Sequence, residues 1–393
     1  METIPSLSSL FIRFLKLGST AYGGPAMIGQ IKQAAVKECG WLKEEDFLQG
    51  LAFIQTIPGG TVPQMVAYVG YRLRGIPGAL ASTVAYLLPS FLTLVFLSII
   101  YFKTRTFWFR EPLFKGLSAI VVAVVLSACL TLGKPILRDW QAIVISILSF
   151  IGFFFRVNVL VILASAALAA FLLYRKEKES EVSPRFERST LEIKRGDLYF
   201  LGLLGALISS GFAVSYFIDP QLTYLGLRLA KIGTLMFGGG FTVIPLIQYE
   251  VVDEFHWITT KEFLDGIALG QLTPGPMMIT AFIGNQHSGL LGAVVATVAL
   301  MSPSFFMLLL LLPYHDWLRS RKPVRTVERG VLASFIGMLG LVLYNFGKTA
   351  FTDIPTVLIA FAAFLALARR VGLPWIILAG GALSLILFGL TGS

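Results

Sequence analysis

Two pairs of basic residues stand inside apolar stretches of the sequence and are the strongest candidates for chemistry. Arg13 and Lys16 are three residues apart, and Arg228 and Lys231 repeat this spacing in the second half of the chain. A lysine or arginine at the centre of a bilayer costs about 2.5 to 3.5 kcal/mol, so four such residues need compensation. One interpretation is an interior cationic site for an anion; the other is that these long side chains reach the polar interface.

Glycines follow each basic pair at matching positions. The first pair is followed by Gly23, Gly24 and Pro25, and the second by Gly238 and Gly239. Consecutive glycines can serve close helix packing, but beside a proline and in both halves they favour breaks in membrane helices. A helix that restarts inside the membrane presents free N–H groups, which bind anions.

A second pair of breaks is predicted where prolines and glycines meet. Pro58 and Gly59 occupy one position, and Pro274, Gly275 and Pro276 occupy its counterpart. Proline removes an amide donor and interrupts regular helix, so either a simple kink or a ligand-lining loop would fit. Polar neighbours favour a lining role, and these neighbours are Gln55, Thr56, Gln271 and Thr273.

Acidic residues give a weaker signal. Glu38 and Glu254 occupy matching positions in charged connections, which favours a solvated interfacial loop. If a proton couples to transport, Glu38, Glu254 or Asp265 would be the candidate carriers. The chain has three histidines and shows no metalloprotease or phosphate-loop motif, so we expect no enzyme, no metal site and no cofactor.

The composition is that of a membrane protein. The 393 residues are 56% hydrophobic and 14% charged, whereas globular chains carry about 25% charge. Apolar runs recur along the chain and predict an all-α polytopic membrane protein with about 12 to 14 transmembrane or re-entrant helices. The net charge of +10 suits anionic lipid or an anionic substrate, and we expect no nucleic-acid partner. Cys39 and Cys129 are expected to be packing residues.

The sequence is duplicated. Trp41 matches Trp257, and the Pro-Ser-Phe run at 89–91 matches 303–305, with separations of 214 to 216 residues. We divide the chain into an N-terminal repeat (1–174), a charged cytoplasmic linker (175–196), an extra transmembrane helix (197–218) and a C-terminal repeat (219–393). Six segments plus the extra helix make seven crossings, which inverts the second copy. If 139–174 were a single span the copies would be parallel, but Arg156 and Asn158 favour a turn there.

The repeated blocks resemble those of the chromate ion transporter family. They are Lys-x-Gly followed by an aromatic residue and Gly-Gly, Gln-x-x-Pro-Gly at 55–59 and 271–275, and Gly-x-x-Gly-Ala at 75–79 and 289–293. The resemblance covers both halves and implies export of chromate from the cytoplasm of a prokaryote across its inner membrane, with sulfate as a competitor. Gly240 replaces Pro25 and Pro276 replaces Gly60 in the second copy, which implies an asymmetric site.

These observations predict a chromate exporter whose central anion site is formed by Lys16, Lys231 and the glycine breaks. A tetrahedral dianion suits lysines and free helix N-termini, and sulfate would suit them equally. A transporter of sulfate or another oxyanion is therefore the alternative. An enzyme acting on lipid headgroups and a scaffold without transport activity are remoter options. Coupling to protons and a homodimer both stay open.

Overall fold

The computed structural model describes residues 5–22, 25–104, 107–175, 195–276, 278–314 and 322–389. These residues form helices and turns and contain no strand, which confirms the predicted all-α fold. Gly23, Gly24 and residues 176–194 of the predicted linker lie outside the described residues.

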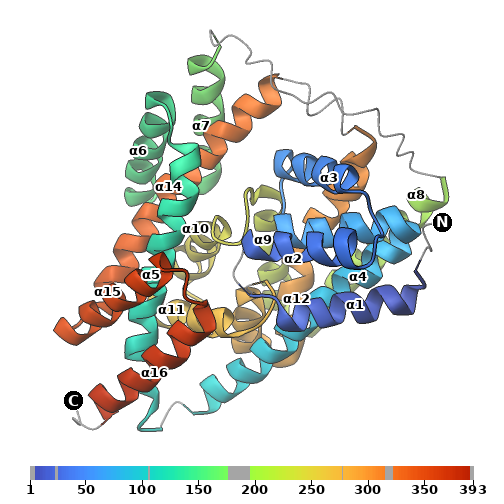
Figure 1. Ribbon diagram of the computed structural model, residues 1–393. Helices are drawn as coiled ribbons and strands as arrows, with labels where there is room; N and C mark the ends of the chain where they lie inside the picture. Colours follow the sequence, from blue (N-terminus) through green and yellow to red (C-terminus); the bar gives the residue numbers. More distant parts are fainter. Residues whose placement is uncertain are drawn as a thin grey trace.

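The helices follow the same order in both halves of the chain (Figure 1). The first half contains α1 (Leu7–Thr20), α2 (Pro25–Lys32), the π-helix η1 (Gln33–Glu38), α3 (Glu44–Thr56), α4 (Thr61–Lys103), α5 (Arg110–Ile136), α6 (Trp140–Phe154) and α7 (Val159–Leu173). The second contains α9 (Pro220–Leu235), α10 (Val243–Gln248), the π-helix η2 (Tyr249–Glu254), α11 (Thr260–Leu272), α12 (Ile279–Leu311), η3 (Leu312–Tyr314), α14 (Lys322–Ala350), α15 (Ile354–Ala368) and α16 (Leu373–Gly389). The helix α8 (Arg195–Ile218) connects the halves.

Backbone breaks occur at the same places in the two copies. Helix α4 loses helical geometry at Gly75 (φ +62°) and α12 at Gly289 (φ +58°), a conformation that glycine adopts without strain. The predicted turn between α6 and α7 is present at Arg156 (φ +57°), and Arg370 (φ +62°) takes the same conformation between α15 and α16. The prediction of a turn instead of a single span is therefore confirmed.

Five helices in the described parts of the chain are long and apolar enough to cross a membrane. They are Thr61–Lys103, Arg110–Ile136, Gly196–Ile218, Ile279–Tyr314 and Pro323–Ala350. Helices α6, α7, α15 and α16 are apolar but shorter. In α8 only 11% of the most apolar window is buried inside the protein, so this helix is exposed around most of its circumference.

Glycines let the first helix of each copy approach a long helix closely. A Cβ on Gly18 would lie 2.3 Å from the carbonyl oxygen of Tyr86, and one on Gly233 would lie 2.2 Å from that of Leu300. Helix α1 thus packs on α4, and α9 on α12, at backbone contact. Such small-residue contacts are typical of membrane helices, where close van der Waals packing replaces the hydrophobic effect.

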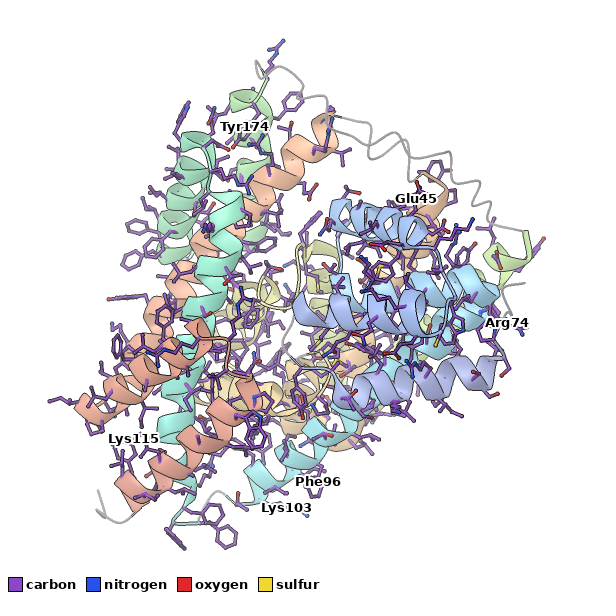
Figure 2. All side chains as sticks on the ribbon, viewed as in Figure 1. Glu45, Arg74, Phe96, Lys103, Lys115 and Tyr174 are labelled. Atoms are coloured by element: carbon purple, nitrogen blue, oxygen red, sulfur yellow. The ribbon has the colours of Figure 1, made fainter. Side chains whose placement is uncertain are left out.

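Helices α5 and α14 hold the two copies together. Helices α6 and α7 (green in Figure 1) pack against α14, whereas α15 and α16 (red) pack against α5. Lys115 and Tyr174, labelled in Figure 2, lie at opposite ends of this helix assembly. Each copy therefore covers the long helix of the other copy with its own last two helices.

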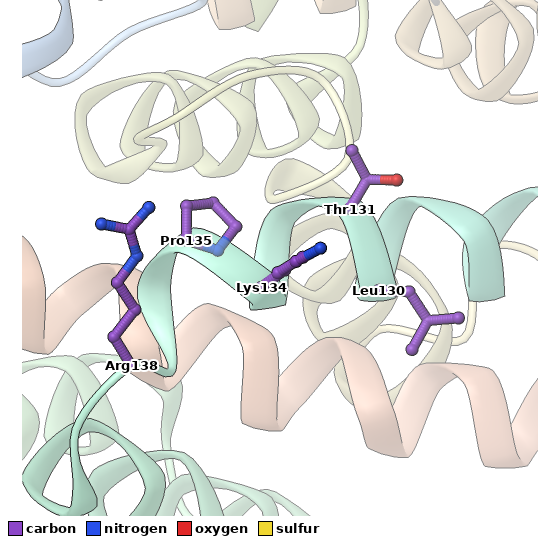
Figure 3. A pocket seen from close by; sticks show the side chains of 5 residues that line it. All are labelled: Leu130, Thr131, Lys134, Pro135 and Arg138. Carbon is purple, nitrogen blue, oxygen red and sulfur yellow. The ribbon is translucent and has the colours of Figure 1, made fainter.

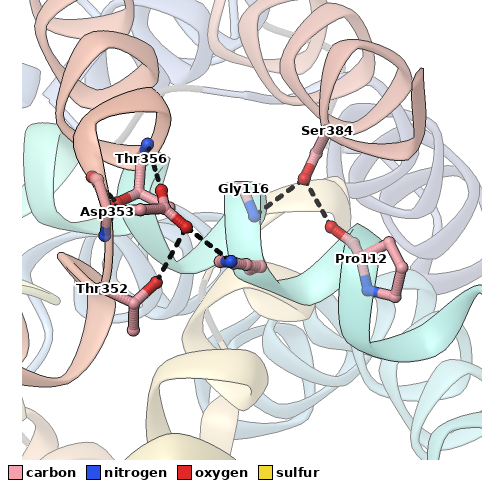
Figure 4. Close-up of polar contacts among 7 residues, drawn as sticks. Pro112, Gly116, Thr352, Asp353, Thr356 and Ser384 are labelled. Atoms are coloured by element: carbon pink, nitrogen blue, oxygen red, sulfur yellow. Dashed lines mark hydrogen bonds and ion pairs between the residues drawn. The ribbon is translucent and has the colours of Figure 1, made fainter. Parts of the chain in front are cut away.

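Two matching ion pairs show how α5 and α14 are oriented relative to each other. Arg329, near the start of α14, lies 2.8 Å from Asp139 just after α5, and Lys115, near the start of α5, lies 2.5 Å from Asp353 just after α14. Asp139 and Asp353 also cap α6 and α15 by accepting backbone amides, as Figure 4 shows for Asp353 and Thr356. The equivalent helices α5 and α14 are therefore antiparallel, which is the predicted inverted arrangement.

Candidate anion site at the paired helix breaks

The first break follows the basic pair in each copy. Helix α1 ends at Thr20 with an extended Ala21, and α9 ends at Leu235 with an extended Met236. Beyond Met236, Gly238 (φ +75°) and Gly239 (φ +124°) adopt conformations that disfavour other residues. The predicted glycine break is therefore present in the second copy. In the first copy the chain resumes as helix α2 at Pro25.

The second break is the Pro-Gly loop that precedes the long helix. Helix α3 ends at Thr56 and α4 begins at Thr61, while α11 ends at Leu272 and α12 begins at Ile279. Gly59 (φ +143°) and Gly275 (φ +86°) lie in the positive-φ region. Pro58, Pro274 and Pro276 lie in these non-helical loops, so both copies interrupt the helix where the sequence predicts it.

The two kinds of break contact each other across the repeats. The Gly275 amide donates to the carbonyl oxygen of Ala21 at 2.7 Å, and the Gly59 amide donates to that of Met236 at 2.6 Å. The second break of each copy is thus hydrogen-bonded to the first break of the other copy. Such reciprocal contacts are those of a pseudo-two-fold axis that passes between the loops.

Two equivalent serines support these loops from the opposite repeat. The Ser90 hydroxyl donates to the carbonyl oxygen of Pro276 at 2.7 Å, and the Ser304 hydroxyl accepts the amide of Gly60 at 3.2 Å. The Gln64 amide nitrogen donates to the carbonyl oxygen of Ser304 at 3.1 Å. Sequence reasoning did not nominate the serines as site residues. The repeated Pro-Ser-Phe run was the signal that could have found them.

The basic pair of the second copy surrounds a buried carboxylate. Lys231 Nζ lies 2.6 Å from Glu250 Oε1, and Arg228 lies 3.6 Å from Glu250 Oε2. The side chain of Glu250 is 4% exposed, and a carboxylate this buried requires such partners. This cluster of Arg228, Lys231 and Glu250 keeps one net positive charge. Glu250 was not identified from the sequence as a site residue. Ala34 occupies the matching place in η1, so comparison of the two repeats does not reveal this carboxylate.

The basic pair of the first copy has different surroundings. Arg13 forms an ion pair with Glu38, whose side chain is exposed. Lys16 is exposed on α1, and its ammonium group has no ion pair within the described ranges. The two basic pairs are therefore equivalent in sequence but not in electrostatics, because the carboxylate beside Lys231 is buried, whereas in the described part of the first copy the exposed Glu38 pairs with Arg13 and not with Lys16.

The other predicted polar residues differ in burial. Gln55 is exposed, Gln271 and Thr56 are half-buried, and Thr273 is buried with its hydroxyl 3.2 Å from that of Ser90. Gln271, in the last turn of α11, and Thr273, directly after this helix, both precede Gly275, whose amide contacts Ala21.

The three acidic residues that the sequence suggests as proton carriers also differ in burial. Glu38 and Glu254 are exposed, whereas Asp265 is buried between α4, α5 and α11. It accepts hydrogen bonds from the Tyr101 hydroxyl at 2.7 Å and the Ser118 hydroxyl at 3.1 Å. In the part of the chain that the structure describes, no group of histidine, cysteine and carboxylate side chains has the arrangement of a metal site.

The fold and the paired breaks define a class: a two-repeat, multi-pass helical membrane protein with interrupted helices at its repeat interface. The chain belongs to the chromate transporter family, whose model matches residues 8–171 and 223–385. The two matched ranges coincide with the two copies. They leave out the connecting region that contains α8.

This chain is similar to proteins that match almost its full length and to shorter proteins that match less than half of it. An uncharacterised transporter of Methanocaldococcus jannaschii is 34% identical over 98% of this chain and 94% of its own. A chromate transport protein of Cupriavidus metallidurans is 30% identical over 99% of this chain and 96% of its own. The uncharacterised transporter YwrB of Bacillus subtilis is 34% identical over 38% of this chain, which is 80% of its own length. No solved structure matches this chain.

Proposed function

We propose that this protein transports chromate out of the cytoplasm across the inner membrane of a prokaryote. The observation that carries the proposal is the match of both repeats to the chromate transporter family, together with a full-length relative named as a chromate transport protein. The chain is thus proposed to be a transporter and not an enzyme.

The electrostatics of a dianion supports the proposed outward direction. Moving two negative charges out across an inside-negative potential of about 100 mV releases roughly 4.6 kcal/mol, and import costs the same amount. Export of a dianion therefore needs little coupling to another ion. If a proton is nevertheless exchanged, Asp265 is the candidate carrier that the fold encloses, with Glu38 and Glu254 as exposed alternatives.

The proposed anion site lies at the paired breaks and uses Lys16, Lys231, Arg13 and Arg228. Lys231 is held by Glu250, so the anion would compete with a carboxylate for this ammonium group. Lys16 has no such competitor among the described residues. Because each loop is hydrogen-bonded to the opposite repeat, rocking of one repeat against the other would change both halves of the site together.

The proposal is tested with inside-out vesicles that take up labelled chromate. Lys16→Ala and Lys231→Ala should each reduce uptake at least tenfold at equal expression. Lys348→Ala removes an exposed lysine near the end of α14 and is the matched control. Unchanged uptake in both site variants would exclude the site assignment, and absence of chromate uptake by the unmodified protein would exclude the function. Competition by sulfate separates the chromate exporter from a general oxyanion transporter.

A further inference from the structure

A second cationic site lies at the C-terminal end of α5, apart from the helix breaks. Lys134 and Arg138 border an open pocket of about 450 Å³, and Figure 3 shows them with its other lining residues, Leu130, Thr131 and Pro135. Both basic side chains are exposed, and neither forms an ion pair with any residue that the structure describes. Two cations without an ion-pair partner in the described ranges, beside a hydroxyl group, are the kinds of group that bind a phosphate-like anion.

Exposed apolar residues lie on the rim of this pocket and in the helix that follows it in the chain. Leu130 on its rim is 56% exposed, and Trp140, which begins α6, is 62% exposed. One side of α6 continues from Trp140 as a row of exposed aliphatic residues, namely Ile143, Val144, Ile147, Leu148 and Ile151. Such a row on a membrane helix contacts acyl chains, and tryptophan is enriched at the membrane–water boundary. The pocket therefore lies at headgroup level.

The pocket is on the same face as the start of the basic linker. Tyr174, at the end of α7, donates a hydrogen bond to Asp139, which directly follows Arg138, and Arg329 pairs with the same carboxylate. Residues 175–195 contain seven basic side chains, and connections of this kind lie on the cytoplasmic side. The cytoplasmic leaflet is also the one whose anionic lipids give a negative surface potential.

The matching place in the second repeat lacks one of the two cations. Lys348 occupies the position of Lys134 and lies 5.5 Å from the centre of the Tyr344 ring, but Thr352 stands where the first repeat has Arg138. Because the repeats are inverted, the two-cation pocket is present at one end of the α5/α14 pair only. A site for a lipid of one leaflet accounts for this asymmetry.

We propose that the pocket binds the headgroup phosphate of an anionic phospholipid of the cytoplasmic leaflet. Lys134 and Arg138 would bind the phosphate oxygens, the Thr131 hydroxyl would donate to one of them, and the acyl chains would lie along the exposed row of α6. Exposed Leu130 in the pocket, and exposed Trp140 two residues after Arg138, favour a lipid over a free oxyanion, which would make no apolar contacts there. This inference does not depend on the transported substrate.

The test measures binding of dioleoylphosphatidylglycerol to the purified full-length protein by native mass spectrometry, with dioleoylphosphatidylcholine as the zwitterionic comparison. A cation near an anionic headgroup contributes about 1 kcal/mol, or about fivefold in affinity. The Lys134→Gln/Arg138→Gln double variant should therefore bind phosphatidylglycerol about 30-fold more weakly. Lys348→Gln removes the equivalent charge at the other end and should bind it as the unmodified protein does.

Three outcomes would overturn the proposal: unchanged phosphatidylglycerol binding by the double variant, equal binding of both lipids by the unmodified protein, or displacement of the lipid by millimolar inorganic phosphate. The last result would assign the pocket to a free anion. Both substituted side chains are exposed, so the thermal midpoint in phosphatidylcholine should not change. If it does, the single variants replace the double variant, and each should lose about fivefold.

Discussion

The amide of Gly275 and the carbonyl oxygen of Ala21 are 2.7 Å apart, and this hydrogen bond joins a loop of the second repeat to the end of α1. Gly59 and Met236 form the equivalent bond in the other direction. In each copy, the Pro-Gly loop of the second break is hydrogen-bonded to the first break of the other copy and, among the described residues, not to that of its own. The candidate site therefore exists only when both copies are packed together.

Substitution of Gly275 should damage both stability and transport. Its φ of +86° is strained for any other residue, and a Cβ would lie 3.3 Å from both the Gly18 carbonyl oxygen and Ser90 Cβ. We expect Gly275→Ala to lower the free energy of unfolding by about 1 to 3 kcal/mol. Thermal unfolding in detergent measures the loss. Gly202→Ala in α8, where the added methyl group meets no atom within 4 Å, is the control and should not be destabilised.

Gly18→Ala tests the contact between α1 and α4. The new methyl group would lie 2.3 Å from the Tyr86 carbonyl oxygen, so the two helices must separate. The expected loss of stability is about 1 to 3 kcal/mol, and Gly233→Ala should give a similar loss in the second copy. Gly29→Ala in α2, which has open space around it, provides the comparison. Equal stability of all three variants would contradict the packing described for α1 and α9.

Lys231 and Glu250 should depend on each other. Lys231→Ala leaves a carboxylate that is 4% exposed without its nearest cation, and we expect a loss of about 3 to 5 kcal/mol. Adding Glu250→Gln removes the unpaired charge and should recover most of this loss. The double-mutant cycle, measured by thermal unfolding, gives the coupling energy. Additive losses would show that the pair is not coupled.

Lys16→Ala should behave differently from Lys231→Ala. Lys16 is exposed and has no ion pair within the described ranges, so its removal should change the free energy of unfolding by less than about 0.5 kcal/mol. A drop in chromate transport in this variant would therefore report on the site and not on folding. Expression level and thermal midpoint are measured alongside uptake. A large loss of stability would contradict the exposed position of Lys16.

The ion pair between Lys115 and Asp353 should be only partly restored by exchanging its charges. Lys115→Asp places two carboxylates together and should destabilise the protein, and Asp353→Lys in the same chain reinstates opposite charges. Lysine cannot accept the Thr356 amide, so about 1 kcal/mol from the lost helix cap should remain. Complete rescue in thermal unfolding would show that the cap contributes nothing.

The residue types at the helix breaks made the breaks predictable, but they did not predict which residues of the other repeat the breaks contact. Proline and positive-φ glycine specify an interruption from neighbouring residues alone, so the loops around Gly59 and Gly275 and the turn at Arg156 follow from the sequence. The bond between Gly275 and Ala21 depends on how distant helices pack, which no local pattern encodes. Glu250 was missed for a related reason, because repeat comparison reveals only features that both copies keep, and this carboxylate is present in one.

Helix α8 has a consequence for how such chains could arise. It is exposed around most of its circumference and falls between the two ranges that match the family model. We propose that it adds one membrane crossing, which would change the number of crossings between the copies from even to odd. Two separate half-length proteins could pair in opposite orientations without it, but a single fused chain could not. In a fused chain, α8 is therefore the element that we propose allows the second copy to insert into the membrane in the opposite orientation.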